Sequence, residues 1–277
     1  MKLAEITALL ADAGVASPDW DARLLAAHVL GVGHMSVRPG TEVPGEVLVL
    51  ARRRAGREPL QHILGTAPFG PLDLAVGPGV FIPRPETEVL ADWGVRSLRP
   101  PTPGVRRVIV DLCAGSGALG LYVATQRRDA DVTLVEKSAE ALTWLRRNVE
   151  TFAPRATIVQ ADVTDPEILP DLHGRVDLLL TNPPYVPETG ALEPEVYADP
   201  HDAVFAGADG MSVIDRMTST LAALLVDGGL LGIEHDETTA EAVTAVLAEH
   251  GGFAEIATMS DLTGRPRFTT AVRRASV

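Results

Sequence analysis

The chain has 277 residues and is 46% hydrophobic, so it is long enough for one large α/β domain, or a domain with an appendage, and can bury a substantial core. Its net charge of -13, with Lys2 and Lys137 as the only lysines, argues against direct DNA binding, because phosphate neutralisation needs a basic face. The single cysteine excludes an internal disulfide, the seven histidines show no zinc-site spacing, and no apolar run could span a membrane, so we expect a cytoplasmic protein without a metal.

Residues 1–64 are predicted to form a small helical domain. Apolar residues recur at helical spacing over 3–14, a second helix should end before Gly31, and a third should start near Pro44. The third helix leads into a cluster of arginines: Arg52, Arg53, Arg54 and Arg57. Such a cluster predicts either a solvated helix face or a docking surface for an acidic partner.

Residues 65–82 combine glycine and proline with alternating apolar residues, which predicts a β-hairpin that links two domains. The following loop, 83–88, carries two prolines and two glutamates and can cap a helix over 86–98. Prolines and a glycine over 100–104 then interrupt the chain before its main sheet.

The rest of the chain alternates predicted strands and helices. Strands are predicted over 107–111, 131–136, 156–161, 175–181, 229–234, 253–258 and 267–273. Helices are predicted over 117–128, 138–150, 211–226 and 236–250. This alternation indicates a mostly parallel sheet that is covered on both faces.

A glycine-rich turn follows the first of these strands and fits the fingerprint of a nucleotide-binding turn. Glu136 ends the second strand, where its carboxylate can accept hydrogen bonds from two ribose hydroxyls. The pattern alone does not separate NAD from S-adenosylmethionine, but Asp111 before the glycines suits the ammonium of a methionine moiety and would repel a pyrophosphate. Asp162, after the third strand, either contacts an adenine or caps a turn before Pro166.

Asn182-Pro183-Pro184-Tyr185 follows an apolar run, which predicts a corner at the carboxyl end of a central strand, where open α/β sheets bind ligands. The prolines fix the backbone and remove donors, so the Asn182 side-chain oxygen and the Pro183 carbonyl remain as acceptors beside the Tyr185 ring. Two acceptors and a flat aromatic ring suit a planar NH2 group. An ordinary Pro-Pro turn that ends the strand is the alternative interpretation.

With these motifs the chain resembles the HemK/PrmC protein-(glutamine-N5) methyltransferases, which modify class 1 peptide chain release factors. The resemblance covers nearly the whole chain. It is carried by the segments 57–60 with Gly65, 81–88, 111–117, 182–185, 209–210 and 261–267. The chain departs from the family at Asp199-Pro200, where a Glu-Pro pair is frequent, and at 237–239, where a glutamine is frequent.

The resemblance implies an α/β fold: a Rossmann-like seven-stranded S-adenosylmethionine-dependent methyltransferase domain (83–277), preceded by a helical substrate-recognition domain (1–64) and a β-hairpin linker (65–82). The implied partner is a class 1 release factor. S-adenosylmethionine, which leaves as S-adenosylhomocysteine, is expected at Asp111, Cys113, Ala114, Gly115, Ser116, Gly117, Glu136, Asp162, Val163 and Asn182. The substrate glutamine is expected at Asn182, Pro183, Pro184 and Tyr185, of which Asn182, Pro183 and Tyr185 are the expected catalytic residues.

An amide nitrogen is a poor nucleophile because its lone pair is delocalised, so the predicted catalysis depends on positioning by acceptors that bind the transition state better than the neutral amide. Four alternatives remain at this point. The substrate could be a glutamine of a ribosomal protein. It could also be the exocyclic NH2 group (N6) of an adenine in nucleic acid, which needs the same positioning as the glutamine amide, although an acidic chain binds nucleic acid poorly. The chain could be a non-catalytic sensing or scaffolding member of the fold. It could also be a nicotinamide dehydrogenase, against which Asp111 and the Pro-Pro corner count.

Overall fold

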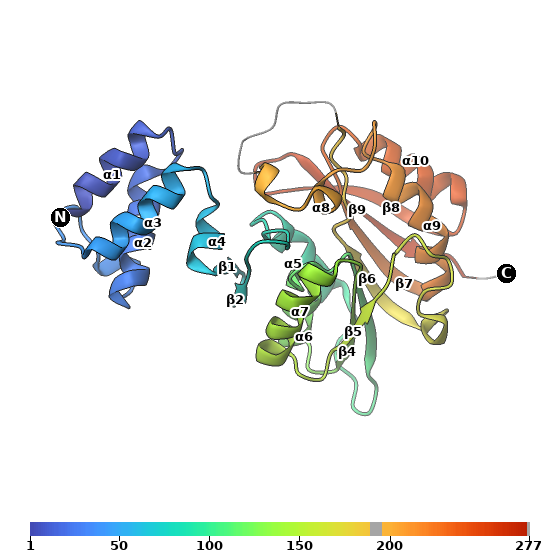
Figure 1. The fold of residues 1–277 in the computed structure, drawn as a ribbon. Helices are drawn as coiled ribbons and strands as arrows, with labels where there is room; N and C mark the ends of the chain where they lie inside the picture. The colour runs from blue at the N-terminus through green and yellow to red at the C-terminus, as the bar shows by residue number, and fades with distance from the viewer. Residues whose placement is uncertain (189–195, 276–277) are drawn as a thin grey trace. The chain divides into compact units, whose positions relative to one another are not determined.

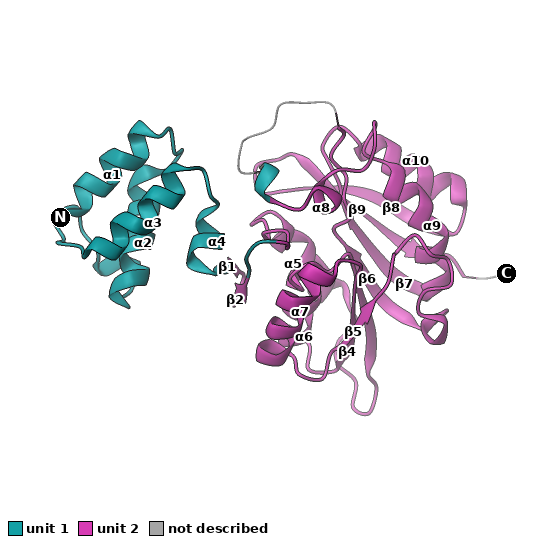
Figure 2. Cartoon of the chain, in the orientation of Figure 1, with its two compact units in different colours: residues 1–67, 76–78, 192–198 teal, residues 68–75, 79–191, 199–277 magenta. Residues whose placement is uncertain are grey.

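The computed structural model describes residues 1–188 and 196–275. They form two compact units, coloured separately in Figure 2. The first unit comprises residues 1–67 and 76–78 with the short η3 helix (Val196–Ala198), and the second holds the other described residues. No helix in the described part of the chain is both long enough and apolar enough to cross a membrane.

The first unit is a set of helices around its own apolar core. Its helices are α1 (Leu3–Asp12), α2 (Pro18–Leu30), η1 (His34–Ser36), α3 (Gly45–Ala55) and α4 (Leu60–Leu64). Leu3, Ile6 and Leu10 recur at helical spacing and are buried in that core, which is why the pattern located α1 correctly.

The arginine cluster on and after α3 is not one solvated face. Arg54 is buried, and its Nε donates to Asp21 Oδ2 on α2 at 2.7 Å. Arg57 donates from its guanidinium to the Gly14 carbonyl oxygen at 2.7 Å, whereas Arg52 is exposed. The solvated-face interpretation is therefore wrong for Arg54, because a buried guanidinium needs a carboxylate partner inside the protein.

The predicted hairpin is present as β1 (Thr66–Phe69) and β2 (Leu72–Ala75), which pair in a two-stranded sheet. Residues 76–82 form no strand, so the hairpin is shorter than predicted. Asn148 holds its end: the side chain accepts from the Ala75 N–H at 2.8 Å and donates to the Ala75 carbonyl at 3.0 Å. Asn148 belongs to the helix Ala139–Phe152, so these two hydrogen bonds attach the end of the hairpin to that helix.

The second unit contains the predicted seven-stranded sheet. Its strands are β3 (Arg107–Leu112), β4 (Ala130–Glu136), β5 (Thr157–Gln160), β6 (Val176–Thr181), β7 (Leu225–Glu234), β8 (Phe253–Ser260) and β9 (Pro266–Arg273). The order is β5-β4-β3-β6-β7-β9-β8, parallel up to β7, with β9 antiparallel to both of its neighbours. The seven-stranded, mostly parallel prediction is confirmed. β7 starts at Leu225, earlier than the predicted residue 229, because it follows the preceding helix without a loop.

Helices cover both faces of this sheet (Figure 1). One face holds α5 (Thr87–Ser97), α6 (Ala118–Gln126) and α7 (Ala139–Phe152), and the other holds α9 (Ser212–Leu224) and α10 (Ala240–His250). Successive side chains of a strand point to opposite faces, so Leu178 and Leu180 join the first core and Leu179 joins the second. This explains why the three central residues of β6, Leu178 to Leu180, are all apolar.

Candidate active site

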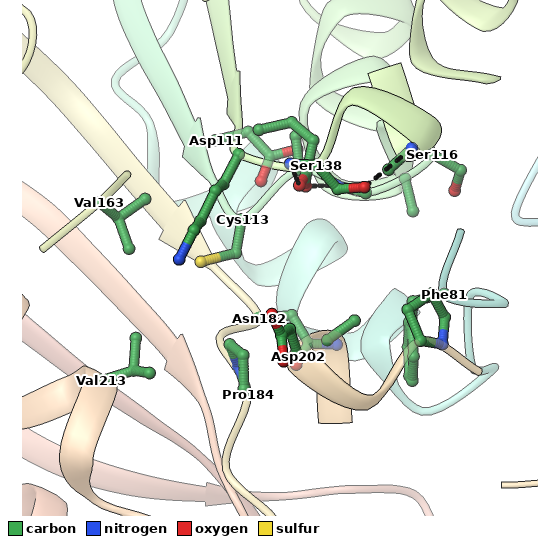
Figure 3. A pocket seen from close by; sticks show the side chains of 18 of the residues that line it. Phe81, Asp111, Cys113, Ser116, Ser138, Val163, Asn182, Pro184, Asp202 and Val213 are labelled. Carbon is green, nitrogen blue, oxygen red and sulfur yellow. Dashed lines mark hydrogen bonds between the residues drawn. The ribbon is translucent and has the colours of Figure 1, made fainter. Parts of the chain in front are cut away.

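A cavity of about 550 Å³ lies at the carboxyl ends of the parallel strands in the second unit (Figure 3). The chain runs from β3 to β4 and β5 on one side and then returns to β6 on the other side of β3. A reversal of strand order of this kind opens a crevice between neighbouring loops, and open α/β sheets bind their ligands there. The volume suits a small-molecule ligand.

The structure brings most of the predicted site residues to this one cavity. Those that line it are Asp111, Cys113, Ala114, Gly115, Ser116, Glu136, Asp162, Val163, Asn182 and Pro184. Gly117, Pro183 and Tyr185 lie beside these residues in sequence but are not part of the cavity wall. The predicted substrate corner therefore presents Asn182 and Pro184 to the cavity.

The glycine-rich turn joins β3 to α6 and is held by Glu136 at the end of β4. Glu136 Oε2 accepts from the Gly115 N–H at 2.8 Å, and Oε1 accepts from the Ser138 N–H at 2.7 Å. Gly117 begins the helix with φ 92, and a Cβ there would lie 2.7 Å from the Leu145 side chain. Glycine at 117 is thus required twice, by the left-handed backbone and by the close packing of α7.

Asp111 lies at the bottom of the cavity with only 1% of its surface exposed. Its Oδ2 accepts from the Gly120 N–H in the first turn of α6 at 2.8 Å. Burial raises the pKa of Asp111 to about 7, the Gly120 hydrogen bond opposes that rise, and the charge of Glu136 adds to it. A buried carboxylate with a raised pKa would be stabilised in its charged form by a cationic ligand group.

Asp162 both shapes a turn and faces the cavity. One oxygen accepts from the Thr164 N–H at 2.9 Å and from its hydroxyl at 2.7 Å, while the other lies 3.0 Å from Lys137 Nζ. The Thr164 hydrogen bonds, with a smaller contribution from Lys137, lower the pKa of Asp162 to about 2. The two interpretations of Asp162, a turn cap and a ligand contact, are therefore compatible, because it does the first and lines the cavity as well. The buried apolar side chain of Val163 lines the same wall.

Cys113 has the left-handed backbone angle φ 59 that the turn imposes. Burial raises the pKa of its thiol, and the nearby carboxylates, Glu136 first, raise it further. A thiol that stays protonated is a weak nucleophile, so Cys113 serves as a small wall residue.

The Asn182–Tyr185 corner is fixed from both sides. Before it, the Thr181 hydroxyl donates to the Leu112 carbonyl of β3 at 2.8 Å. After it, the Tyr185 and Val186 N–H groups both donate to the Val204 carbonyl, at 3.2 and 2.9 Å. The Asn182 amide itself makes no hydrogen bond to any residue in the described part of the chain, although it faces the cavity. The corner is rigid, and its amide is available to a ligand.

Tyr185 does not line the cavity and is held by contacts behind the corner's two prolines in the sequence. Its phenol O–H donates to Glu234 Oε1, at the end of β7, at 3.1 Å. Burial first, and then the charge of Glu234, raises the pKa of the phenol. Below the corner, Gly210 approaches so closely that a Cβ there would lie 2.3 Å from the Tyr185 carbonyl oxygen. The position of Tyr185 therefore depends on Glu234 at the end of β7 and on the close approach of Gly210.

Sequence reasoning did not assign a site role to the second rim of the cavity. The short helix α8 (His201–Val204) contributes His201 and Asp202 to the wall. The buried carboxylate of Asp199 just before it accepts from the Ile82 N–H at 3.2 Å and forms an ion pair with Arg84. Asp199 thus joins α8 to the 81–88 loop. The sequence signal for the contact between Asp199 and Arg84 is the acid at position 199, where the chain departs from the family.

Comparison with known proteins extends over both units. Two protein-family models match: "PrmC N-terminal domain" over residues 2–65 and "Methyltransferase small domain" over residues 90–198. The release factor glutamine methyltransferase of Corynebacterium glutamicum is 56% identical over 271 residues, which span 97% of this chain and 96% of that protein. The release factor glutamine methyltransferase of Mycolicibacterium smegmatis is 48% identical over 274 residues, or 97% and 95% of the two chains.

Among solved structures, the fold is similar to that of a T. thermophilus 16S rRNA N2 G1207 methyltransferase in complex with AdoMet and guanosine. The TM-score is 0.52 at 23% identity, and the match covers 76% of this chain and 50% of that one. At this identity the likeness supports the methyltransferase fold only.

Proposed function

This chain belongs to the release factor glutamine methyltransferase family, and we infer that it transfers a methyl group from S-adenosylmethionine to the side-chain amide nitrogen (N5) of a glutamine in a class 1 peptide chain release factor. The observation that carries this inference is the 56% identity that extends over 97% of the chain. Release factors act on ribosomes, so we place the reaction in the cytoplasm.

The cavity residues fit S-adenosylmethionine. Each Glu136 oxygen already accepts one backbone hydrogen bond and keeps a further lone pair, which suits the two ribose hydroxyls. The buried Asp111 carboxylate suits the ammonium of the methionine moiety, and Asp162 with Val163 offers an acceptor beside an apolar surface for the adenine. When bound, S-adenosylmethionine supplies a methyl group that its sulfonium sulfur makes electrophilic.

The Asn182 corner would hold the glutamine amide. Its side-chain oxygen has no hydrogen bond to the described residues, and the adjacent Pro183 carbonyl belongs to a residue without a competing N–H. Both oxygens can accept N–H bonds from one planar NH2 group and direct its nitrogen. Positive charge develops on that nitrogen during transfer, so the same acceptors stabilise the transition state more than the ground state. Tyr185, which does not line the cavity, would hold this corner in place through its hydrogen bond to Glu234.

The helical domain, residues 1–64, would recognise the release factor, since it forms an apolar core of its own and contributes no residue to the cavity wall. Its exposed Arg52 offers a positive charge for this contact. In a test, Arg52→Glu should lower kcat/KM on the release factor at unchanged affinity for S-adenosylmethionine. Equal kcat/KM values would remove Arg52 from the recognition surface.

The deciding experiment uses the purified protein with methyl-labelled S-adenosylmethionine and three substrates: the class 1 release factor of Corynebacterium glutamicum, a large-subunit ribosomal protein and DNA. We expect label on a glutamine of the release factor. Label only on the ribosomal protein, or only on DNA adenine, would replace the proposed substrate with one of the alternatives. No transfer to any of the three, at demonstrated cofactor binding, would contradict the proposed activity itself.

A further inference from the structure

Glu234 is a buried acid next to the substrate corner that the reaction described so far does not use. It is the last residue of β7 and has no exposed surface. Oε1 accepts from the Tyr185 phenol at 3.1 Å. Oε2 is equally buried and has no hydrogen-bond partner among the described residues. A carboxylate oxygen left in this state is costly, so it calls for a role.

A second polar atom without a hydrogen-bond partner among the described residues belongs to Thr87 in the cavity wall. Thr87, the first residue of α5, is 2% exposed and lines the cavity, and its Oγ1 likewise has no hydrogen-bond partner in the described part of the chain. The Thr87 hydroxyl lies near the Glu234 carboxyl and lowers its pKa, although the two groups are not in hydrogen-bond geometry in this structure. A threonine hydroxyl has one O–H to donate and lone pairs to accept. With a substrate in the cavity, Thr87 would therefore be able to accept an N–H and to turn its own O–H toward Glu234.

We propose that Thr87 and Glu234 form a proton relay that removes the proton from the substrate amide nitrogen when it is methylated. The inference rests on the proposed function, because it concerns the same site and substrate. Thr87, in the wall that Asn182 and Pro184 also line, is the catalytic residue that touches the amide, and Glu234 is a positioning residue that acts through Thr87.

With this relay, every bond, electron pair and proton of the methyl transfer is accounted for. The amide nitrogen forms a bond to the methyl carbon as the carbon–sulfur bond breaks, and the electron pair of that bond stays on sulfur. The nitrogen then carries one proton too many and a positive charge. This proton passes to Thr87 Oγ1 while the Thr87 hydroxyl proton passes to Glu234 Oε2, so a neutral N-methyl amide and a protonated Glu234 result. Glu234 returns its proton to solvent before the next turnover.

The surroundings of Glu234 suit this exchange. Burial raises the pKa of Glu234 to about 7, against the opposing effect of the Thr87 and Tyr185 hydroxyls. Of the charged groups that face it, Glu86 raises the pKa and Arg267 lowers it. A relay that needs the ionised carboxylate is active above this pKa and loses activity as pH falls below about 7.

Single-turnover methyl transfer to the release factor, at saturating S-adenosylmethionine between pH 6 and 8, separates the relay from a structural role. For the parent we expect a rate that falls about tenfold per pH unit below the inflection. Glu234→Gln should be at least about tenfold slower at pH 8 and should lose the inflection. Asp111 also titrates near 7 and stays intact in Glu234→Gln, so an inflection caused by Asp111 would survive in that variant.

Thr87→Val and Thr87→Ser test the residue of the relay that would contact the substrate amide. Valine keeps the shape but removes the hydroxyl, and we expect the rate at pH 8 to fall at least about tenfold, whereas serine should restore most of that loss. Thr220→Val is the matched control, because Thr220 is a buried threonine on α9 whose Oγ1 also has no partner in the described residues but which does not line the cavity. Its rate should equal that of the parent.

The relay is wrong if Thr87→Val transfers methyl as fast as the parent, or if Glu234→Gln keeps the parent rate and pH profile. If Glu234→Gln does not fold, as shown by its thermal melt, the comparison of valine and serine at position 87 decides alone. The parent is measured first. A parent that binds S-adenosylmethionine but does not methylate the release factor overturns the proposed function and the relay with it, while slow variants of an active parent bear on the relay only.

Discussion

Glu136→Gln is the substitution for which the structure gives the most specific expectation about cofactor affinity. Gln has nearly the same shape as Glu, but it replaces one carboxylate oxygen by an NH2 donor and removes the charge. Both Glu136 oxygens are in use: one accepts from the Gly115 N–H and the other from the Ser138 N–H. In either orientation of the Gln amide, its NH2 therefore faces a backbone N–H instead of accepting from it.

Two losses set the magnitude. A charge-assisted hydrogen bond to a ribose hydroxyl is worth about 1.5–3 kcal/mol. The mismatched backbone N–H adds about 1 kcal/mol, the lower end for an unpaired donor, because water reaches this half-buried turn. Affinity for S-adenosylmethionine should fall by about 2.5–4 kcal/mol, or about 60- to 1000-fold. Glu136→Ala should cost about 1.5–3 kcal/mol, since the space it leaves lets water pair with both N–H groups.

Isothermal titration calorimetry with S-adenosylmethionine measures both variants against the parent. Glu140→Gln is the matched control, because Glu140 also lines the cavity but holds neither of these N–H groups. We expect its affinity to change by less than about threefold. Parent-like affinity of Glu136→Gln, with the fold intact by circular dichroism, would refute the assignment of Glu136 to the ribose and to the turn.

Three further predictions concern the corner and the helical unit. Asn182→Ala should slow single-turnover methyl transfer about 100-fold or more at saturating cofactor, and Asn182→Asp should retain more activity than Ala, since it keeps an acceptor; equal parent and Ala rates would contradict the amide-holding role. Asp21→Ala should destabilise the first unit by about 3–5 kcal/mol in urea unfolding, because it removes the carboxylate that pairs with the buried Arg54, while cofactor affinity stays constant. A loss of stability under about 1 kcal/mol would contradict a stabilising role of the Asp21–Arg54 ion pair. Gly210→Ala should impair methyl transfer by displacing the Tyr185 carbonyl, whereas Gly207→Ala, with a similar φ but no atom within 3.4 Å of the added Cβ, should cost stability only; equal effects would show that backbone strain alone is responsible.

The sequence by itself determined the order and type of nearly all the elements around the cavity. The signals were local ones: a period of two or an unbroken apolar run for strands, a period near 3.6 for helices, and glycine or proline at the ends. The family resemblance led us to expect Asp111, Glu136 and Asn182 at one cofactor site, and all three line one cavity, because the carboxyl ends of the parallel strands β3, β4 and β6 share one edge. The four-residue helix α8 was missed because it is too short to show a period.

Only the tertiary structure decided which partner each buried polar group has. Arg54 belonged to a run that a helix face could have presented to water, yet it pairs with Asp21 on another helix. Tyr185 was expected beside the substrate, and the structure places its hydroxyl on Glu234, 49 residues further along the chain. Hydrogen bonds between distant segments depend on how helices and strands pack, and on the high cost of leaving a buried polar group unpaired. A pattern along the chain does not contain that information, because it records which side chains are buried and not which of them face each other.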